Sequence, residues 1–181
     1  MTGQGMGPTI SIVTACYNST PFLDRIYQSL AAQTYRNFEW ICVDDCSIDD
    51  TVDRLLALDA PGTLGMQVYR LPRNTGGPVA LAVGTQHARG EITIWLDHDD
   101  ELFPFALEEV RRNWPAVAGD PALSGLSLRA ADPATGLIGR ELPAGLRLTA
   151  SEGLNRFPDI SDGTLAVKTE LMQHFATVEA M

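Results

Sequence analysis

Apolar and polar residues follow one another in blocks along the first hundred residues, and the blocks predict strands that alternate with helices. Runs rich in β-branched and aromatic residues are typical of buried strands, and apolar residues at helical spacing indicate amphipathic helices. The predicted strands span residues 9–14, 38–43, 66–71 and 92–96, and helices begin near Thr20, at Asp49 or Asp50, and at Val79. This alternation requires a mostly parallel sheet with right-handed crossovers. We therefore expect an α/β fold whose Rossmann-like central sheet carries helices on both faces.

The pattern is less regular after residue 104. Residues 105–114 predict a helix that ends at Pro115, and residues 123–128 predict a strand. Residues 132–136 have the composition of a turn within a hairpin. The remaining expected elements are a short helix over 149–157, a strand over 163–167 and a helix over 168–175.

At 181 residues the chain has the length of one domain with a sizeable core. Within residues 1–181 we expect a flexible lead over 1–8, a nucleotide-binding half over 9–104 and a substrate-facing half over 105–181.

Charge and composition exclude some classes of protein. The 13 basic and 23 acidic residues give a net charge of −10, which argues against nonspecific nucleic-acid binding. No apolar run approaches the ~20 residues that span a bilayer, and residues 1–7 lack the basic and apolar regions of a secretory signal. Without a signal, Cys16, Cys42 and Cys46 favour reduced thiols in a cytoplasmic protein.

Three carboxylates, Asp97, Asp99 and Asp100, come directly after the strand predicted at 92–96. Like charges this close repel one another, and a bound divalent cation relieves the repulsion. Hard cations such as Mg²⁺ and Mn²⁺ prefer oxygen ligands. In open α/β sheets, ligands bind beyond the carboxyl ends of the strands, where this cluster is expected. The alternative is a solvated acidic turn that caps the helix beginning near Pro104.

A second acidic cluster ends the strand predicted at 38–43. Helix capping accounts for Asp49 and Asp50, but Asp44 and Asp45 lie one turn too early for it. A carboxylate in this place accepts hydrogen bonds from a nucleotide base or a ribose hydroxyl. We favour this ligand contact for Asp45.

A glycine-containing loop joins the third predicted strand to the next helix. Gly76 and Gly77 allow a backbone to approach a ligand closely, and the N-terminus of the following helix attracts anions. Arg73 is placed to pair with a phosphate. Glycine and proline also occur in ordinary loops, so this loop matters only beside the two acidic clusters. Together the three clusters describe a site for a nucleotide diphosphate.

Six short segments, taken in order, resemble the family 2 glycosyltransferases of the GT-A fold. The resemblance covers about residues 9–104 and, more loosely, 163–171. Any one segment is modest evidence, whereas the ordered set is specific. The segments are SIVTACYN (11–18), QTY (33–35), VDDCSIDDT (43–51), NTGGP (74–78), ARGE (88–91) and LDHDD (96–100).

The resemblance implies roles for single residues. Asp97 and Asp99 would form the DxD motif, with Asp99 as the direct ligand of Mn²⁺ or Mg²⁺ and Asp97 near the ribose or the metal. His98 occupies the variable middle position, where a spacer is expected. Ala15, Tyr17 and Asp45 would surround the uracil or other base. The expected donor contacts are Ala15, Tyr17, Asp45, Arg73, Gly76, Gly77 and Asp97.

The chain departs from the family pattern in places that matter for chemistry. Ala15 stands where the family often has proline, and Leu81-Ala82 stand where it often has Arg-Asn, which bears on how the diphosphate is held. The family's general base usually lies in an acidic motif after the region matching 163–175, where only Glu179 follows here in a different context. Either the acceptor-side half is incomplete or the base comes from elsewhere. Asp159 and Asp162 are then the candidates, against an ordinary role in turns or solvation.

The expected function is transfer of a sugar from a nucleotide-diphosphate donor, favoured as a UDP-sugar, to an acceptor hydroxyl. The resemblance implies metal dependence and inversion. One alternative is a nucleotide-sugar-binding module without catalysis. Another is a nucleotidyltransferase, although the glycine-rich loop expected after its first strand is absent here. The expected partners are the donor and a saccharide or lipid-linked acceptor, with no nucleic acid, and the composition leaves peripheral membrane association open.

Overall fold

The structure is a computed structural model that describes residues 9–59, 62–132, 134–137, 147 and 164–176. The chain divides into two compact units. Residues 1–126 and 166–181 form what we call the main unit, and residues 127–165 form the insert unit. Each is described by itself.

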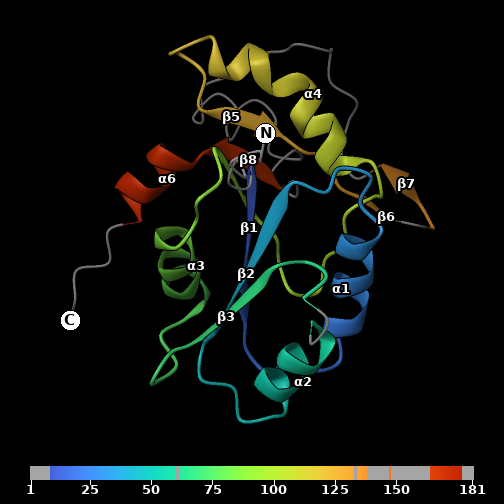
Figure 1. Cartoon of the computed structure of the whole chain (residues 1–181), viewed down its shortest axis with the longest axis vertical. Coiled ribbons are helices and arrows are strands. Elements are labelled where there is room, and N and C mark those ends of the chain that lie inside the picture. Colours follow the sequence, from blue (N-terminus) through green and yellow to red (C-terminus); the bar gives the residue numbers. More distant parts are fainter. Residues whose placement is uncertain (1–8, 60–61, 133, 138–146, 148–163, 177–181) are drawn as a thin grey trace, which may run out of the picture. The chain divides into compact units, whose positions relative to one another are not determined.

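Strands and helices alternate through the first part of the main unit (Figure 1). The elements up to the fourth strand are β1 (Ile10–Cys16), α1 (Leu23–Ala31), β2 (Phe38–Asp44), α2 (Thr51–Leu58), β3 (Met66–Arg70), α3 (Gly77–Gln86) and β4 (Ile92–Trp95). The later elements are α4 (Ala106–Ala118), β5 (Gly125–Ser127), β8 (Leu165–Lys168) and α6 (Thr169–Phe175). Each matches an element expected from the sequence. The short helix expected over 149–157 lies outside the described residues.

Six strands within the described ranges form one sheet in the order β3-β2-β1-β4-β8-β5. Parallel pairs join β1 to β2, β1 to β4, and β2 to β3, with Ile10 opposite both Phe38 and Ile92. The strand β8 runs antiparallel to β4. The mostly parallel sheet is therefore confirmed. Because parallel strands share one direction, the carboxyl ends of β1, β2, β3 and β4 lie along the same edge.

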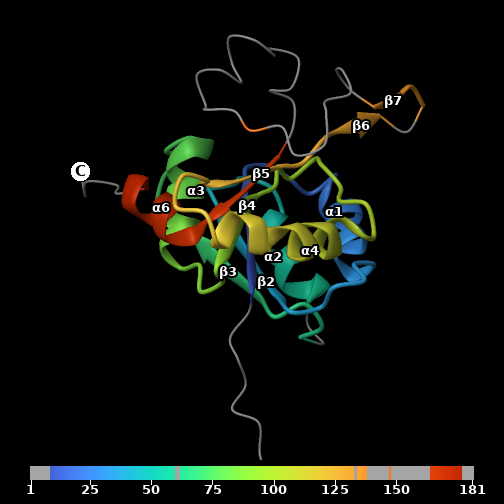
Figure 2. The same ribbon diagram turned by 90° about the horizontal axis from the view of Figure 1, so that it is seen from above.

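Helices cover both faces of the sheet (Figure 2). On one face α3 packs on β1 and β2, over a core that includes Val13 and Ile41, and α6 lies beside α3. A Cβ atom on Gly84 of α3 would lie 2.4 Å from Cγ1 of Val13, so the close approach of this helix to the sheet requires glycine. On the other face, Tyr27 of α1 lies against Trp40 of β2 with ring centroids 6.5 Å apart.

The first two helices begin differently from one another. Thr20 does not cap α1, which begins at Leu23, because its hydroxyl donates instead to Oδ2 of Asp49 at 2.7 Å. Oδ1 of Asp49 accepts the backbone N–H of Thr51, the first residue of α2, at 3.1 Å. The helix α1 therefore begins later than the start expected near Thr20. Of the two residues expected to cap α2, Asp50 is the N-cap residue and makes no capping hydrogen bond with its side chain, whereas Asp49 accepts the N–H of the first helical residue.

Pro115 does not end α4, contrary to expectation, because the helix continues to Ala118. Proline in a helix interior costs about 3 kcal/mol or more. Trp114 and Val117, on either side of it in sequence, are both buried. Their burial outweighs the cost of the proline and extends the helix by one turn.

Cys16 and Cys42 are buried free thiols in neighbouring strands. Burial raises the pKa of Cys42 well above its ordinary value of 9.0, and a hydrogen bond with Cys16 adds to the effect. Both side chains therefore act as packing groups. Among the described helices, none combines the length and the apolar character needed to cross a bilayer.

The described part of the insert unit contains a hairpin. The strands β6 (Ala131–Asp132) and β7 (Gly136–Leu137) pair in antiparallel fashion. Oδ1 of Asp132 accepts the backbone N–H groups of Thr135 and Ala134, each at 2.8 Å, and these bonds lower the pKa of Asp132. The turn expected over 132–136 is confirmed.

Candidate functional site

The loops that follow β1 and β2 are tied to each other at the carboxyl edge of the sheet. The backbone N–H of Asn18 donates to Oγ of Ser47 at 2.9 Å, and Oδ1 of Asn18 accepts the N–H of Ile48 at 3.0 Å. The N–H of Ser19 donates to Oγ1 of Thr51 at 2.8 Å. Ala15, the last residue but one of β1, is half-buried, and Tyr17 lies 44% exposed in the loop. Both expected base contacts therefore lie on this edge.

Asp45 joins the loop after β2 to the loop after β3. Its carboxylate is 2% exposed and accepts three hydrogen bonds. Oδ1 accepts the N–H and the hydroxyl of Thr75 at 2.7 and 2.9 Å, and Oδ2 accepts the N–H of Gly76 at 2.7 Å. Asp45 thus fixes the position of the glycine loop, a role that the sequence did not indicate. Its contact with a nucleotide base stays a prediction.

Gly76 gives the loop its shape and begins α3. It is the N-cap residue, with φ +90° and ψ 150°, a backbone conformation that is essentially restricted to glycine. Gly77 is the first helical residue, so the N-terminus of α3 points to the same edge as Asp45. Arg73 lies exposed on this loop. The structure thus brings the second and third predicted clusters together.

The first acidic cluster follows β4 at the same edge. Asp97, Asp99 and Asp100 are all exposed. Partial desolvation and the charges of Asp97 and Asp99 raise the pKa of Asp100 above its ordinary value of 3.8. Arg25 of α1 is the nearby counter-charge, donating to Oε1 of Glu101 at 2.8 Å and to the carbonyl of Asp99 at 3.4 Å. Desolvation is the largest cause of this shift, and repulsion by Asp97 and Asp99 adds to it.

The cluster fits a hard cation in chemistry, although it is not a complete cage. Among the described residues, no group of three or more histidine, cysteine or acidic side chains is arranged to hold a metal ion alone. Mg²⁺ is typically bound by one or two carboxylates while substrate phosphates and water supply the other ligands. Asp97 and Asp99, both exposed at this edge, suit that arrangement.

Gln33 supports the segment that follows the acidic cluster. This buried side chain donates to the carbonyls of Ser29 and Phe103, at 3.0 and 2.9 Å, and accepts the N–H of Leu107 at 3.1 Å. The backbone of Thr34 also donates to the carbonyl of Pro104 at 2.8 Å. The QTY segment of the sequence is therefore a support for the loop that carries the carboxylates.

Glu39 forms a second supporting network, and the sequence analysis missed it. This glutamate is 3% exposed within β2. Oε1 accepts the Ser11 hydroxyl at 2.7 Å and the Arg89 N–H at 2.8 Å, and Oε2 accepts the Arg89 guanidinium at 2.6 Å. Burial alone would raise the pKa of Glu39, but these hydrogen bonds outweigh it and lower the pKa below 4.5. The signal was present as one acidic residue inside an apolar strand, followed later by the ARGE segment.

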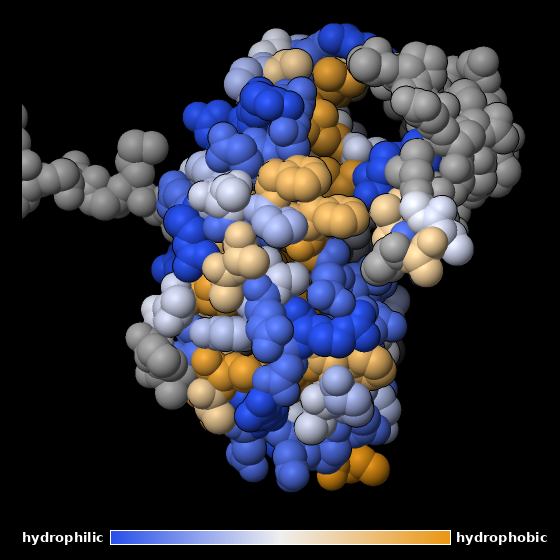
Figure 3. Space-filling model, turned by 90° about the vertical axis from the view of Figure 1, so that its right-hand side faces the viewer, coloured by the Kyte–Doolittle hydropathy of each residue, from blue (hydrophilic) through white to orange (hydrophobic). Residues whose placement is uncertain are grey.

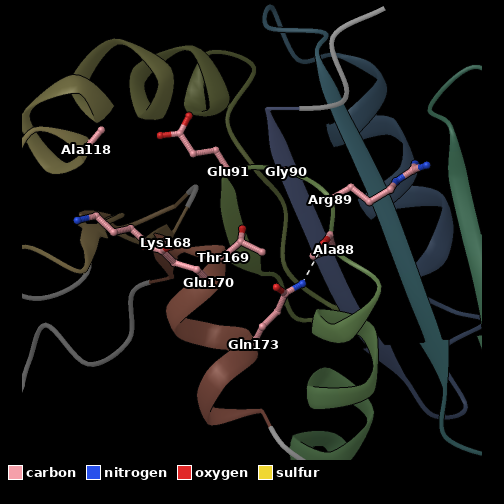
Figure 4. Close-up of a pocket in the computed structure, with 9 residues that line it drawn as sticks. All are labelled: Ala88, Arg89, Gly90, Glu91, Ala118, Lys168, Thr169, Glu170 and Gln173. Atoms are coloured by element: carbon pink, nitrogen blue, oxygen red, sulfur yellow. Dashed lines mark hydrogen bonds between the residues drawn. The ribbon is translucent and has the colours of Figure 1, made fainter.

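A hollow of about 470 Å³ lies at the opposite edge, where β4 begins (Figure 4). Several of its polar side chains are already engaged within the protein. Glu91 accepts Nε1–H of Trp114 at 2.6 Å, Lys168 donates to the carbonyl of Asp120 at 3.2 Å, and Gln173 donates to the carbonyl of Ala88 at 3.0 Å. We therefore assign the hollow a structural role rather than donor binding.

Exposed apolar side chains occur on the surface beside α1. Phe103 and Phe105 are 50% and 56% exposed, and their rings stack with centroids 5.8 Å apart. On the described part of this face, apolar patches are separated by polar side chains (Figure 3). Such separated patches are ordinary for a water-exposed surface.

Comparison with known proteins places the chain in a family. Residues 11–118 match the family described as Glycosyl transferase family 2. The chain belongs to this family. An uncharacterized glycosyltransferase of Rickettsia prowazekii is 34% identical over 102 residues, which make up 56% of this chain and 30% of that protein.

Solved structures of glycosyltransferases share the fold. Residues 1–349 of TarS of S. aureus give a TM-score of 0.68 at 22% identity, covering 92% of this chain and 49% of that TarS chain. The mannosyltransferase PcManGT of Pyrobaculum calidifontis, in complex with GDP-Man and Mn²⁺, gives 0.67 at 19% identity, covering 97% of this chain and 50% of PcManGT. These matches confirm the GT-A fold. This family 2 chain spans about half the length of each of the two solved chains. It spans less than half of the Rickettsia protein.

The candidates for the general base, Asp159 and Asp162, lie outside the described residues. Their assignment stays a prediction, as do the division at residue 104 and the individual donor contacts.

Proposed function

We propose that the chain binds a nucleotide-diphosphate sugar together with Mn²⁺ or Mg²⁺ and transfers the sugar to an acceptor hydroxyl with inversion. The observation that carries this proposal is the alignment of three loops at one sheet edge. The loop of Ala15 and Tyr17, the loop held by Asp45, and the carboxylates after β4 are neighbours there. Membership of glycosyl transferase family 2 supports it.

The proposed donor is a UDP-sugar. A carboxylate at Asp45 can accept a hydrogen bond from the N3–H of uracil, and the exposed ring of Tyr17 can stack on a base. TarS has been crystallised with UDP-GlcNAc, and PcManGT with GDP-Man, so the two structural neighbours differ in nucleotide. Uracil N3–H recognition by Asp45 is what would select UDP here.

Each loop has a proposed task in the reaction. Gly76 and Gly77 let the backbone lie close to the diphosphate, at the N-terminus of α3. Asp97 and Asp99 would hold the cation, which when bound supplies charge neutralisation of the leaving diphosphate. A carboxylate base takes the proton of the acceptor hydroxyl, and Asp159 and Asp162 are its candidates.

Product formation tests the proposal directly. The chain is incubated with UDP- and GDP-sugars, Mn²⁺ and a panel of saccharide and lipid-linked acceptors, and glycosylated products are measured. Metal-dependent transfer supports the proposal. Donor binding without transfer to any acceptor favours a binding module, and release of pyrophosphate from a nucleoside triphosphate and a sugar phosphate favours a nucleotidyltransferase.

A further inference from the structure

An apolar pocket of about 400 Å³ opens between α3, α6 and the end of β4 in the main unit. Pro78 and Ala82 come from α3, Trp95 ends β4, and Leu171 and Met172 come from α6. Among the described residues that line it, none has an ionisable side chain. This lining makes the pocket suited to an uncharged, apolar ligand.

Trp95 gives the pocket a fixed aromatic wall. The strand pattern predicts a buried residue, but Trp95 is 37% exposed. Its Nε1–H donates to Oγ1 of the buried Thr85 at 2.9 Å, so the polar atom of the indole is already satisfied inside the protein. The hydrogen bond holds the ring in place, and what remains open to a ligand is apolar ring surface.

The pocket adjoins the proposed donor site. Pro78 directly follows Gly77 at the start of α3, and Trp95 precedes Asp97 by two residues at the end of β4. An extended chain spans at most about 3.6 Å per residue, so the carboxylate-bearing backbone begins within about 7 Å of Trp95. The pocket therefore lies beside the backbone that carries the proposed metal ligands.

Ala82 makes one wall of the pocket apolar. A polar amide at this position, as in an Ala82→Asn variant, would face the pocket, and burying an unpaired amide against a ligand is unfavourable. The methyl group of Ala82 leaves the wall free to contact an apolar ligand.

We propose that this pocket binds the apolar portion of a glycosyl acceptor, namely an alkyl or isoprenoid-like chain attached close to the accepting hydroxyl. This inference rests on the proposed function and narrows its acceptor to an amphiphile. The volume lies in the range of small-molecule sites, roughly 300–1,000 Å³. A bare sugar ring would leave most of its hydroxyls unpaired against these walls, whereas a hydrocarbon chain has no polar group to satisfy.

Binding of n-alkyl glucosides tests the proposal without requiring turnover. Methyl, hexyl and octyl glucoside are titrated below their aggregation concentrations, and tryptophan fluorescence is recorded. Each added methylene that enters the pocket tightens Kd about threefold to fourfold. Trp40 and Trp114 are buried, so Trp95→Phe should remove the fluorescence change, while calorimetry still detects the binding.

Two variants and a matched control locate the site. Ala82→Asn and Met172→Gln each weaken octyl glucoside by about tenfold or more and leave the weak binding of methyl glucoside unchanged. Leu56→Asn makes a comparable apolar-to-polar change at a 58% exposed position on α2, and it leaves octyl glucoside binding unchanged. Thermal melting shows that each variant is folded.

The outcomes separate this inference from the proposed function, because UDP with Mn²⁺ is titrated into the same samples. If UDP binds but the affinity for the alkyl glucosides does not depend on the length of their alkyl chain, the acceptor pocket alone is overturned. Length-dependent binding that Ala82→Asn and Leu56→Asn weaken equally also overturns it. Length-dependent binding that is confined to the pocket variants, with no UDP binding, overturns the proposed function and leaves an apolar-ligand site.

Discussion

Replacing Asp45 with alanine removes the one carboxylate that joins the loops after β2 and β3. It takes away the acceptor of the Thr75 N–H and hydroxyl and of the Gly76 N–H, at 2.7, 2.9 and 2.7 Å. A hydrogen bond to a charged group contributes about 1.5–3 kcal/mol. The three bonds share one carboxylate, and water can reach Thr75 and Gly76, which are only half-buried. We therefore expect Asp45→Ala to lower the free energy of unfolding by about 2–3 kcal/mol.

The same substitution should weaken UDP by one to two decades in Kd, since about 1.4 kcal/mol corresponds to each decade. A change in loop position alone would also weaken UDP. The assay therefore compares UDP with N3-methyl-UDP, in which a methyl group replaces the N3–H. The parent protein should bind the methylated nucleotide more weakly than UDP, and Asp45→Ala should bind both equally.

Asp50→Asn is the matched control for charge. Asp50 is exposed, lies in the neighbouring turn and makes no capping hydrogen bond with its side chain. This variant should keep both the stability and the preference for UDP. If Asp45→Ala retains the penalty against N3-methyl-UDP, the proposed contact with the base is wrong and Asp45 only positions the loop.

Three further substitutions test the two supporting hydrogen-bond networks and the general base. Glu39→Gln should lower the free energy of unfolding at neutral pH by about 1–3 kcal/mol. The pKa of Glu39 in the folded state lies below 4.5, so its contribution to the free energy of unfolding is complete above pH 4.5 and is lost as the pH falls through the folded-state pKa. The free energies of unfolding of the parent and the variant, measured in urea, should therefore converge in acid. Gln33→Ala, which leaves the N–H of Leu107 without its partner, should lower the free energy of unfolding by about 1–3 kcal/mol, whereas Gln28→Ala, at an exposed position on the preceding helix α1, should change it little. If Asp159 or Asp162 is the general base, its asparagine variant should transfer sugar about 10²–10⁴ times more slowly with donor affinity unchanged, and an equal rate would dismiss that residue.

The order of strands and helices could be predicted because it depends on local patterns. The runs at Ile10–Cys16 and Phe38–Asp44 are mostly apolar, and their burial on both faces of the sheet follows from that. The direction of parallel strands then places Asp45 and Asp97 at one edge without any knowledge of distances.

Contacts between distant segments could not be predicted in the same way. Glu39 and Arg89 are separated by 50 positions, and the sequence does not say which cation satisfies a buried carboxylate. Two of the three hydrogen bonds to Asp45 come from the backbone N–H groups of Thr75 and Gly76, which any residue except proline would supply at those positions. Such contacts follow from the packed structure.

The ends of elements also depended on tertiary structure. The low helix propensity of proline predicts that the helix ends at Pro115, but α4 extends to Ala118 because Trp114 and Val117 are buried. Trp95 belongs to an apolar run, yet the covering helices do not close over it. A strand's composition indicates that it is buried, but not how far its neighbours extend along it.

Metal-dependent binding of nucleotide diphosphate tests the central claim most directly. UDP is titrated by calorimetry into the parent chain, Asp99→Asn and Asp53→Asn, each with Mn²⁺ and with a chelator. Asp53 is an exposed acid on α2, so its variant matches the change in charge away from the proposed site. We predict that Mn²⁺ tightens UDP binding about tenfold or more in the parent and in Asp53→Asn, and that Asp99→Asn loses most of this gain while it unfolds at the same temperature as the parent. Equal dependence on Mn²⁺ in Asp99→Asn and the parent would contradict the account.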